Sequence, residues 1–354
     1  MRGMLTSDSL TDAEARAADA QFAILTGAVN LDRKLRANPG MAARFEGALT
    51  RAIRAAYRDA TDIDSAHWLL QRTLYRVNRL GLFWYDDPRQ YVNERSPYLM
   101  AVRERIERAW QEWEMRELDV TGLRRLEAPL ALRSRVRADL AAAPSTAGRY
   151  FAQATSMAGY CRLVQLAALE ALSEVSHLSR ALAGPANDVQ TTLTRVLVER
   201  QRQSTFFHAM LEACGLSTAP EAYFELVPWE LLASINHSFL LSDRRRHFLR
   251  YVGALLYCET SARAAFGEYR AAAARLGLSR PARGYWDAHV AHDARHARWL
   301  LERVALPLAA HHRADAWEIV LGYDQQKLIG ERAAAAIARS ARDADQAATL
   351  RAAA

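Results

Sequence analysis

The stretch Tyr285–Leu300, YWDAHVAHDARHARWL, constrains the fold of this chain more than any other. It contains neither Gly nor Pro, and Gly284 stands just before it, so it is expected to form one helix. At about 100° per residue, His289, Asp293 and His296 lie at roughly 0°, 40° and −20° around the helix axis and therefore point the same way. Two imidazoles and a carboxylate on one face suit iron, manganese or zinc, although a polar solvent-facing stripe is the alternative interpretation. A metal ion would need further ligands from other helices, as in a helical bundle.

A third imidazole, His292, lies at about −60°, on the edge of that stripe. It is adjacent to Asp293 in sequence and diverges from it by about 100°. His289 and His296, in contrast, are each within one turn of Asp293. We therefore expect His292 to lie beside the site rather than in it.

Glycine and proline are scarce, with 16 and 10 in 354 residues, and no alternating run of Val, Ile and Thr bounded by turn residues is present. The chain is therefore expected to be all-α. The formal net charge of +7 is carried almost wholly by arginine, because Lys34 and Lys327 are the only lysines. Basic and acidic residues alternate along most of the expected helices. The sequence thus lacks the basic stripe that nucleic-acid binding requires.

Three cysteines, Cys161, Cys214 and Cys258, are widely spaced, and each is embedded in apolar sequence. They are typical of reduced, buried thiols in a cytoplasmic protein. We expect no signal peptide before the first helix, and no apolar run approaches the ~18 residues of a membrane span. We therefore expect neither a membrane nor a nucleic acid among the partners.

Hydrophobic periodicity and turn signals divide the rest of the chain into helices and two regions. Residues 1–140 form an expected accessory helical region, and residues 146–342 an expected helical bundle. The expected helices span 11–29, 41–60, 64–80, 98–118, 146–182, 188–203, 204–215, 228–241, 243–276, 285–300 and 314–342, before an Ala/Arg tail that frays.

Carboxylates in the second region supply candidates for the remaining ligands. Glu170, Glu174 and His177 repeat the i, i+4, i+7 spacing, for which a solvated face is an equally good interpretation. Glu259 lies in the apolar context LLYCETSA. If buried, it needs a partner, either a hydrogen-bonding group or a metal ion.

Glu199 and His208 form a further pair of candidates. They are about 180° apart on an ideal helix, so both can face one site only if the helix breaks or bulges between them. Ser204–Thr205 offers a new N-cap at which such a break could occur.

The order of these motifs resembles a known family. LVERQRQSTFFHAMLEACGL, ALLYCETSA and HVAHDARH follow one another as in the haem-oxygenase-like diiron oxidases and oxygenases, a group of iron-containing redox enzymes. One departure is that RQRQSTFF stands where members of the family often have glycines. The resemblance implies a haem-oxygenase-like helical bundle and assigns the iron ligands. These are Glu199, His208, Glu259, His289, Asp293 and His296, joined by Glu174, or alternatively Glu170, as the further ligand of N-oxygenating members.

The resemblance also implies two Fe(II) ions and O2 as co-substrate. The leading interpretation is a diiron oxygenase that oxygenates the nitrogen of a small amine or amino-acid-like substrate in a biosynthetic pathway. A desaturase or oxidative C–C lyase on the same ligands is the alternative, and a non-catalytic helical scaffold is an alternative from another class. The ligand set does not distinguish the reactions, since one set serves several of them.

Residues 1–140 are rich in aromatic side chains and carry no metal-ligand constellation. Aromatic residues in such number build either a small core or an interface rich in Trp and Tyr. The aromatic residues concerned are Trp68, Phe83, Trp84, Tyr85, Tyr98, Trp110 and Trp113.

We predict a two-fold homodimer through this N-terminal region, a layout that the resemblance also implies for N-oxygenating members. Light scattering at micromolar concentration should give the mass of two chains, whereas a monomeric full-length chain would contradict the prediction. A shortened chain starting near Pro144 should be monomeric. If it were dimeric, the interface would lie on the bundle instead.

Overall fold

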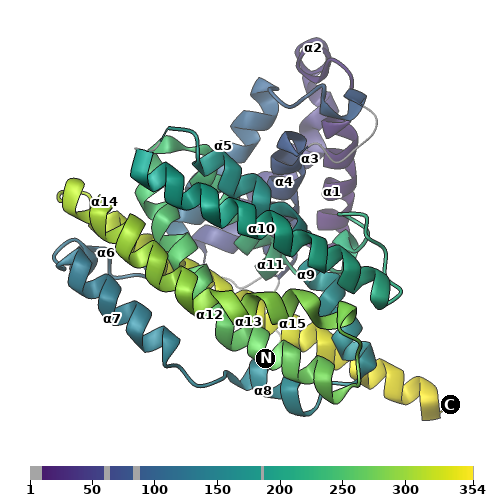
Figure 1. The fold of residues 1–354 in the computed structure, drawn as a ribbon. Coiled ribbons are helices and arrows are strands. Elements are labelled where there is room, and N and C mark those ends of the chain that lie inside the picture. Colours follow the sequence, from purple (N-terminus) through teal and green to yellow (C-terminus); the bar gives the residue numbers. More distant parts are fainter. Residues whose placement is uncertain (1–9, 60–63, 83–87, 185–186, 354) are drawn as a thin grey trace, which may run out of the picture. The chain divides into compact units, whose positions relative to one another are not determined.

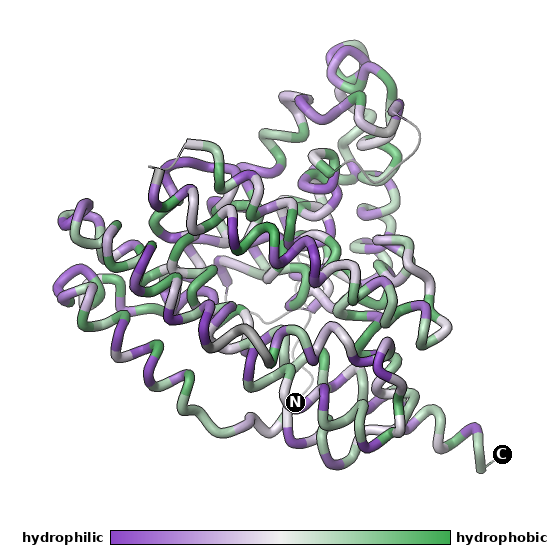
Figure 2. Tube along the Cα trace, in the orientation of Figure 1, coloured by the Kyte–Doolittle hydropathy of each residue, from purple (hydrophilic) through white to green (hydrophobic). Residues whose placement is uncertain are grey.

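A computed structural model describes residues 10–59, 64–82, 88–184 and 187–353, without the side chains of Gln90, Asn187 and residues 291–294. Helices account for 83% of the described residues, which contain no strand, so the all-α prediction is confirmed. Hydrophobic and hydrophilic stretches alternate along the helices (Figure 2), the pattern of amphipathic helices that bury one face. The chain divides into two compact units, residues 1–119 and residues 120–354.

The N-terminal unit contains five α-helices: α1 (Asp12–Thr26), α2 (Leu31–Ala37), α3 (Ala43–Ile53), α4 (Asp64–Asn78) and α5 (Pro97–Arg116) (Figure 1). The predicted capping box at the start of α1 is present, with the Thr11 and Glu14 side chains each accepting from the other residue's backbone N–H. Phe22 and Phe45 stack in the core at 4.4 Å between ring centroids. The unit therefore has a hydrophobic core of its own.

Several aromatic residues of the expected dimer region contact residues of this same unit. Trp110 is buried, and Trp113 packs on Tyr57 at 5.6 Å between centroids. The Trp68 ring lies under the guanidinium group of Arg72 at 4.5 Å, and the Tyr98 hydroxyl donates to Glu46. Phe83, Trp84 and Tyr85 lie outside the described residues.

The C-terminal unit contains the expected bundle (Figure 1). Its long helices are α9 (Met157–Ala181), α10 (Asn187–Ala213), α11 (Trp229–Asp243), α12 (Phe248–Arg275), α13 (Gly284–Leu300) and α15 (Trp317–Ala353). Its shorter helices are α6 (Val120–Leu123), α7 (Ala128–Leu140), α8 (Thr146–Gln153) and α14 (Leu306–His311), which a π-helical turn, Leu301–Ala305, joins to α13.

The division between the units lies earlier than the boundary near residue 140 that the sequence suggested. Helix α7 belongs to the C-terminal unit because its polar side chains are tied to α15. Arg135 forms a bidentate pair with Asp324 at 2.6 and 2.7 Å, and Asp139 accepts hydrogen bonds from Tyr323 (2.8 Å) and Lys327 (2.6 Å). A boundary based on the Pro- and Ser-containing loop misses these contacts between residues far apart in sequence.

The single helix expected over residues 146–182 is wrong, because the chain breaks between α8 and α9. Asp345 of α15 accepts hydrogen bonds there from the Tyr150 hydroxyl (2.5 Å) and from the backbone N–H groups of Ser156 (3.1 Å) and Gly159 (2.6 Å). A carboxylate at the first turn of α9 stabilises a new helix start. The same contact explains why α15 continues to Ala353 instead of fraying after residue 342.

The break expected at Ser204–Thr205 is also absent, since α10 is continuous from Asn187 to Ala213. Both hydroxyls donate back to carbonyl oxygens within the helix, Ser204 to Gln201 and Thr205 to Arg202, each at 2.7 Å. A hydroxyl satisfied in this way does not cap a new helix.

The three cysteines form no disulfide, and each is partly exposed rather than buried. In the helices that the structure describes, none combines the length and apolar character that crossing a membrane requires.

Helices α12 and α15 pack against each other through two glycines. A Cβ atom added at Gly253 would lie 2.8 Å from the backbone nitrogen of Tyr323 and closer still to the Ile319 carbonyl oxygen. A Cβ atom at Gly322 would lie 2.7 Å from the Arg250 carbonyl carbon. The two backbones therefore approach more closely than any side chain allows, which brings the middle of α12 onto the core.

We predict that Gly253→Ala lowers the free energy of unfolding by about 2 kcal/mol or more, because α12 and α15 must move apart. Gly267→Ala in the same helix is the control, since its Cβ would meet nothing within 4 Å. It should be neutral or stabilise by up to about 1 kcal/mol through helix propensity. Urea unfolding of both variants measures the difference, and equal effects would contradict the close-packing argument.

Candidate metal centre

Helix α13 directs two of the predicted ligands into the bundle. His289 and His296 are 0% and 2% exposed. The Nδ1–H of His289 donates to the carbonyl oxygen of Tyr285, one turn earlier, at 3.0 Å, and the ring packs edge-on against Phe266 at 4.7 Å. This hydrogen bond fixes the tautomer and leaves Nε2 as the lone-pair nitrogen that faces the interior.

Two other residues of the α13 motif cannot be placed by their side chains. Asp293, a predicted ligand, and His292, expected beside the site, lie in the helical backbone of α13, but their side chains lie outside the described part of the chain.

Glu259 enters from the middle of α12 and is completely buried. One carboxylate oxygen lies 3.5 Å from Nδ1 of His296, and the other is paired with Arg200. Burial alone would raise the pKa of Glu259, but Arg200 and His296 lower it to about 2. The carboxylate is therefore ionised at neutral pH despite its burial.

Helices α9 and α10 complete the cluster. Glu199 of α10, with a side chain 36% exposed, forms an ion pair with Nε2 of His296. Glu174 of α9 lies 3.2 Å from Nε of Arg200. Partial burial raises the pKa of Glu174 in spite of the attraction of Arg200. Four helices thus bring five of the seven predicted ligands together: Glu174, Glu199, Glu259, His289 and His296.

Of the two carboxylates left open on α9, Glu174 is the one that reaches the cluster. Glu170 accepts a hydrogen bond from Ser234 of α11 at 3.2 Å instead. His177 hydrogen-bonds to the hydroxyl of Tyr251 at 3.1 Å. The three side chains of the i, i+4, i+7 pattern on α9 therefore contact three different residues.

His208 is not brought to the cluster. Because α10 is unbroken, the 180° between Glu199 and His208 persists, and the His208 side chain is exposed. Its neighbour Phe207 faces the core instead. The helix break that was expected to turn His208 toward the site is thus not observed.

Arg200 is the residue of the site that the sequence analysis missed. It is 4% exposed, and its guanidinium group contacts Glu174, Glu259 and Nε2 of His289. The sequence does contain a pattern that predicts a buried position for Arg200. Helical spacing aligns it with Val196, Gln203 and Phe207, two apolar residues and an amide. An arginine inside such a stripe points inward and needs carboxylate partners.

The donor set fits iron in its chemistry, since carboxylates and imidazoles suit Fe and Mn better than a structural zinc site. Its present arrangement does not fit. Among the side chains that the structure describes, no group of three or more His, Cys, Asp or Glu residues is arranged to hold a metal ion. The guanidinium group of Arg200 lies between the ligand side chains.

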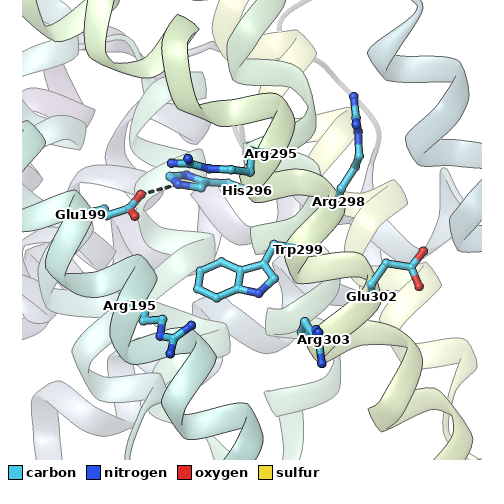
Figure 3. Close-up of a pocket in the computed structure, with 8 residues that line it drawn as sticks. All are labelled: Arg195, Glu199, Arg295, His296, Arg298, Trp299, Glu302 and Arg303. Carbon is cyan, nitrogen blue, oxygen red and sulfur yellow. Dashed lines mark ion pairs between the residues drawn. The ribbon is translucent and has the colours of Figure 1, made fainter.

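A pocket of about 640 Å³ opens beside Glu199 and His296. Figure 3 shows the Trp299 indole in the middle of its wall, with Arg195 and Arg303 beside it. The guanidinium carbon of Arg195 lies 5.5 Å from the Trp299 ring. Among the described side chains, the lining consists of Arg195, Glu199, Arg295, His296, Arg298, Trp299, Glu302 and Arg303.

Positive charge prevails in this pocket, with four arginines against two glutamates. Glu302 is already paired with Arg133 of α7, and Glu199 with His296. The pocket is therefore suited to an anionic group.

We predict that His289 makes the metal-free protein sensitive to mild acid. Burial and the adjacent Arg200 lower its pKa from 6.5 to about 3 in the folded state. Between these values the unfolded chain binds the extra proton, so stability falls as the pH falls. The loss of unfolding free energy from pH 7 to pH 5 should be smaller in His289→Gln by about 2 kcal/mol. His208→Gln, which removes an exposed imidazole, is the control and should leave the pH dependence of urea unfolding unchanged.

The segment that carries the predicted ligands is similar to known proteins. Residues 162–326, which contain all seven predicted ligands, match the family model described as iron-containing redox enzyme. The chain is also 27% identical over 188 residues to a nitrosourea synthase of Streptomyces achromogenes subsp. streptozoticus. That match covers 48% of this chain and 37% of the relative, so the chain spans well under half of the relative's length. Residues 162–326 are thus similar in sequence to the iron-containing redox enzymes.

Proposed function

We propose that this protein is a non-haem diiron, O2-dependent oxygenase that oxygenates the nitrogen of a small amine or amino-acid-like substrate. The observation that carries the proposal is the convergence of three carboxylates and two imidazoles from α9, α10, α12 and α13. Inward carboxylate and imidazole ligands from four helices are how helical bundles hold two iron ions.

The proposed ligands are Glu174, Glu199, Glu259, His289 and His296 by geometry, with Asp293 added by the resemblance alone. His208 is left out because its side chain is exposed and directed away from the cluster. When bound, the iron ions supply the O2 chemistry that amino-acid side chains lack. The chain keeps two of the ligands in binding-competent protonation states. Glu259 is ionised, and His289 is neutral with Nε2 turned inward.

The basic pocket supports an amino-acid-like substrate. A carboxylate in it would meet guanidinium groups such as those of Arg195, Arg298 and Arg303, which pair with carboxylates bidentately. The Trp299 ring offers a flat surface to the rest of the molecule. Since Glu199 and His296 belong to both the pocket and the cluster, a substrate held there would lie against the proposed centre.

The name of the relative supports nitrogen as the atom oxygenated. A nitrosourea contains a nitrogen–oxygen bond, and the relative is a nitrosourea synthase. A desaturase or oxidative C–C lyase on the same ligands remains the alternative. Mass spectrometry of the product separates them: a gain of oxygen on nitrogen supports the proposal, whereas loss of hydrogen or of a carbon fragment supports the alternative.

We predict that anaerobic titration with Fe(II) loads about two equivalents per chain and that mixing with O2 then gives a transient visible absorbance. The double variant His289→Ala/His296→Ala should lose most of the bound iron, because it removes both imidazoles of α13. His311→Ala/His312→Ala removes two exposed imidazoles of the same unit and serves as the control. Iron binding by the first variant equal to wild type would refute the proposal. Less than about a tenth of an equivalent in the wild type would favour the non-catalytic scaffold.

A further inference from the structure

Arg200 occupies the interior of the cluster, where a metal ion would be expected. It follows Glu199 directly on α10, yet only 4% of it is exposed. Its Nη1 donates to Gln203 on the same helix at 3.2 Å, which holds the side chain along the inner face of α10. The side chain is therefore a built-in part of the core.

The guanidinium group also contacts three of the predicted iron ligands. Nε lies 3.2 Å from Glu174, Nη2 pairs with Glu259, and Nη1 meets Nε2 of His289. These ligands come from three different helices, α9, α12 and α13. One planar cation thus neutralises and connects the ligand side chains that approach it.

These contacts exclude a metal ion on the same ligands. The Nδ1–H of His289 is committed to the Tyr285 carbonyl oxygen, so Nε2 holds the one available lone pair of the ring. A lone pair that accepts from Arg200 cannot bind a metal ion at the same time. The Glu259 oxygen paired with Arg200 is occupied in the same way.

Removing the cation without a replacement would be costly. Glu259 is 0% exposed, and a buried carboxylate deprived of its counter-charge destabilises a fold strongly. A divalent metal ion would supply that counter-charge. Glu259 would then no longer depend on Arg200 for compensation.

We propose that Arg200 is the resident cation of the metal-free centre and that it exchanges with the metal. The guanidinium group holds Glu174, Glu259 and His289 together until a metal ion displaces it. Arg200 therefore competes with the metal and sets its apparent affinity. This inference rests on the proposed function in so far as the displacing ion is the metal of that site.

The test uses the full-length, metal-stripped protein and Mn(II) as the probe, with free Mn(II) followed by electron paramagnetic resonance. Arg200→Met keeps the length of the apolar stem and removes the charge. It should bind Mn(II) at least about tenfold more tightly than wild type, because the competing cation is gone. Arg202→Met removes an exposed arginine two residues along α10 and should bind as wild type does.

Thermal unfolding provides a second measurement on the same samples. Without metal, Arg200→Met should melt below both wild type and Arg202→Met, and Mn(II) should raise its melting temperature more than that of wild type. Arg200→Lys retains a charge that cannot bridge three ligands, so its Mn(II) affinity should lie between those of the other two proteins. If Arg200→Met does not fold, the Mn(II) affinity of Arg200→Lys relative to wild type tests the proposal instead.

The remaining outcomes separate the two proposals. If wild type binds Mn(II) and the Arg200 variants bind it equally or more weakly, Arg200 remains beside the metal as an ordering group, and only the exchange inference is overturned. If none of the proteins binds Mn(II) or Fe(II), Arg200 is a permanent structural cation. The exchange and the oxygenase proposal are then both overturned.

Discussion

The C-terminal unit is organised around the cost of burying negative charge inside a helical bundle. Glu259 has no exposed surface, and carboxylates in such a place require a cation or several hydrogen-bond donors. Here the counter-charge comes from α10 through Arg200, and His296 of α13 adds a further polar contact. Through Arg200, this requirement links α10 to α9, α12 and α13. A core that needs a cation is also a core that can accept a metal ion.

The helices that carry these ligands are held by contacts outside the cluster. Glycines at the α12–α15 contact let the two backbones approach and seat the middle of α12, with Glu259, in the interior. On the other side, Trp286 donates to the Tyr160 hydroxyl at 3.0 Å, and Tyr160 donates to the Ala282 carbonyl oxygen at 2.9 Å, which ties α13 to α9. Ligands on rigid helices keep their geometry better than ligands on loops. The arginines of the basic pocket, in contrast, include the exposed side chains of Arg195 and Arg298, which can adjust to a bound molecule.

Local sequence rules succeeded where one helix decides the outcome. Helical spacing on α13 predicted that His289 and His296 share a face, and both are buried, with His296 3.5 Å from Glu259 and His289 in contact with Arg200. The apolar context of Glu259 predicted a buried carboxylate with a partner. The same rules failed on α10, where Ser204 and Thr205 have the chemistry of a helix start but donate to the helix itself. A hydroxyl can serve either purpose, and its surroundings decide which.

The sequence by itself determined the all-α class, most of the helices and the ordered set of carboxylates and imidazoles, because helix propensity and 3.6-residue periodicity act over a few turns. Only the tertiary structure decided which member of each stripe reaches the centre. Periodicity fixes the angles between side chains on one helix, but the rotation of that helix against its neighbours depends on packing across the whole unit. That rotation turned Arg200 inward and left His208 exposed. It also distinguished Glu174, which pairs with the Arg200 guanidinium group, from Glu170, which accepts from Ser234.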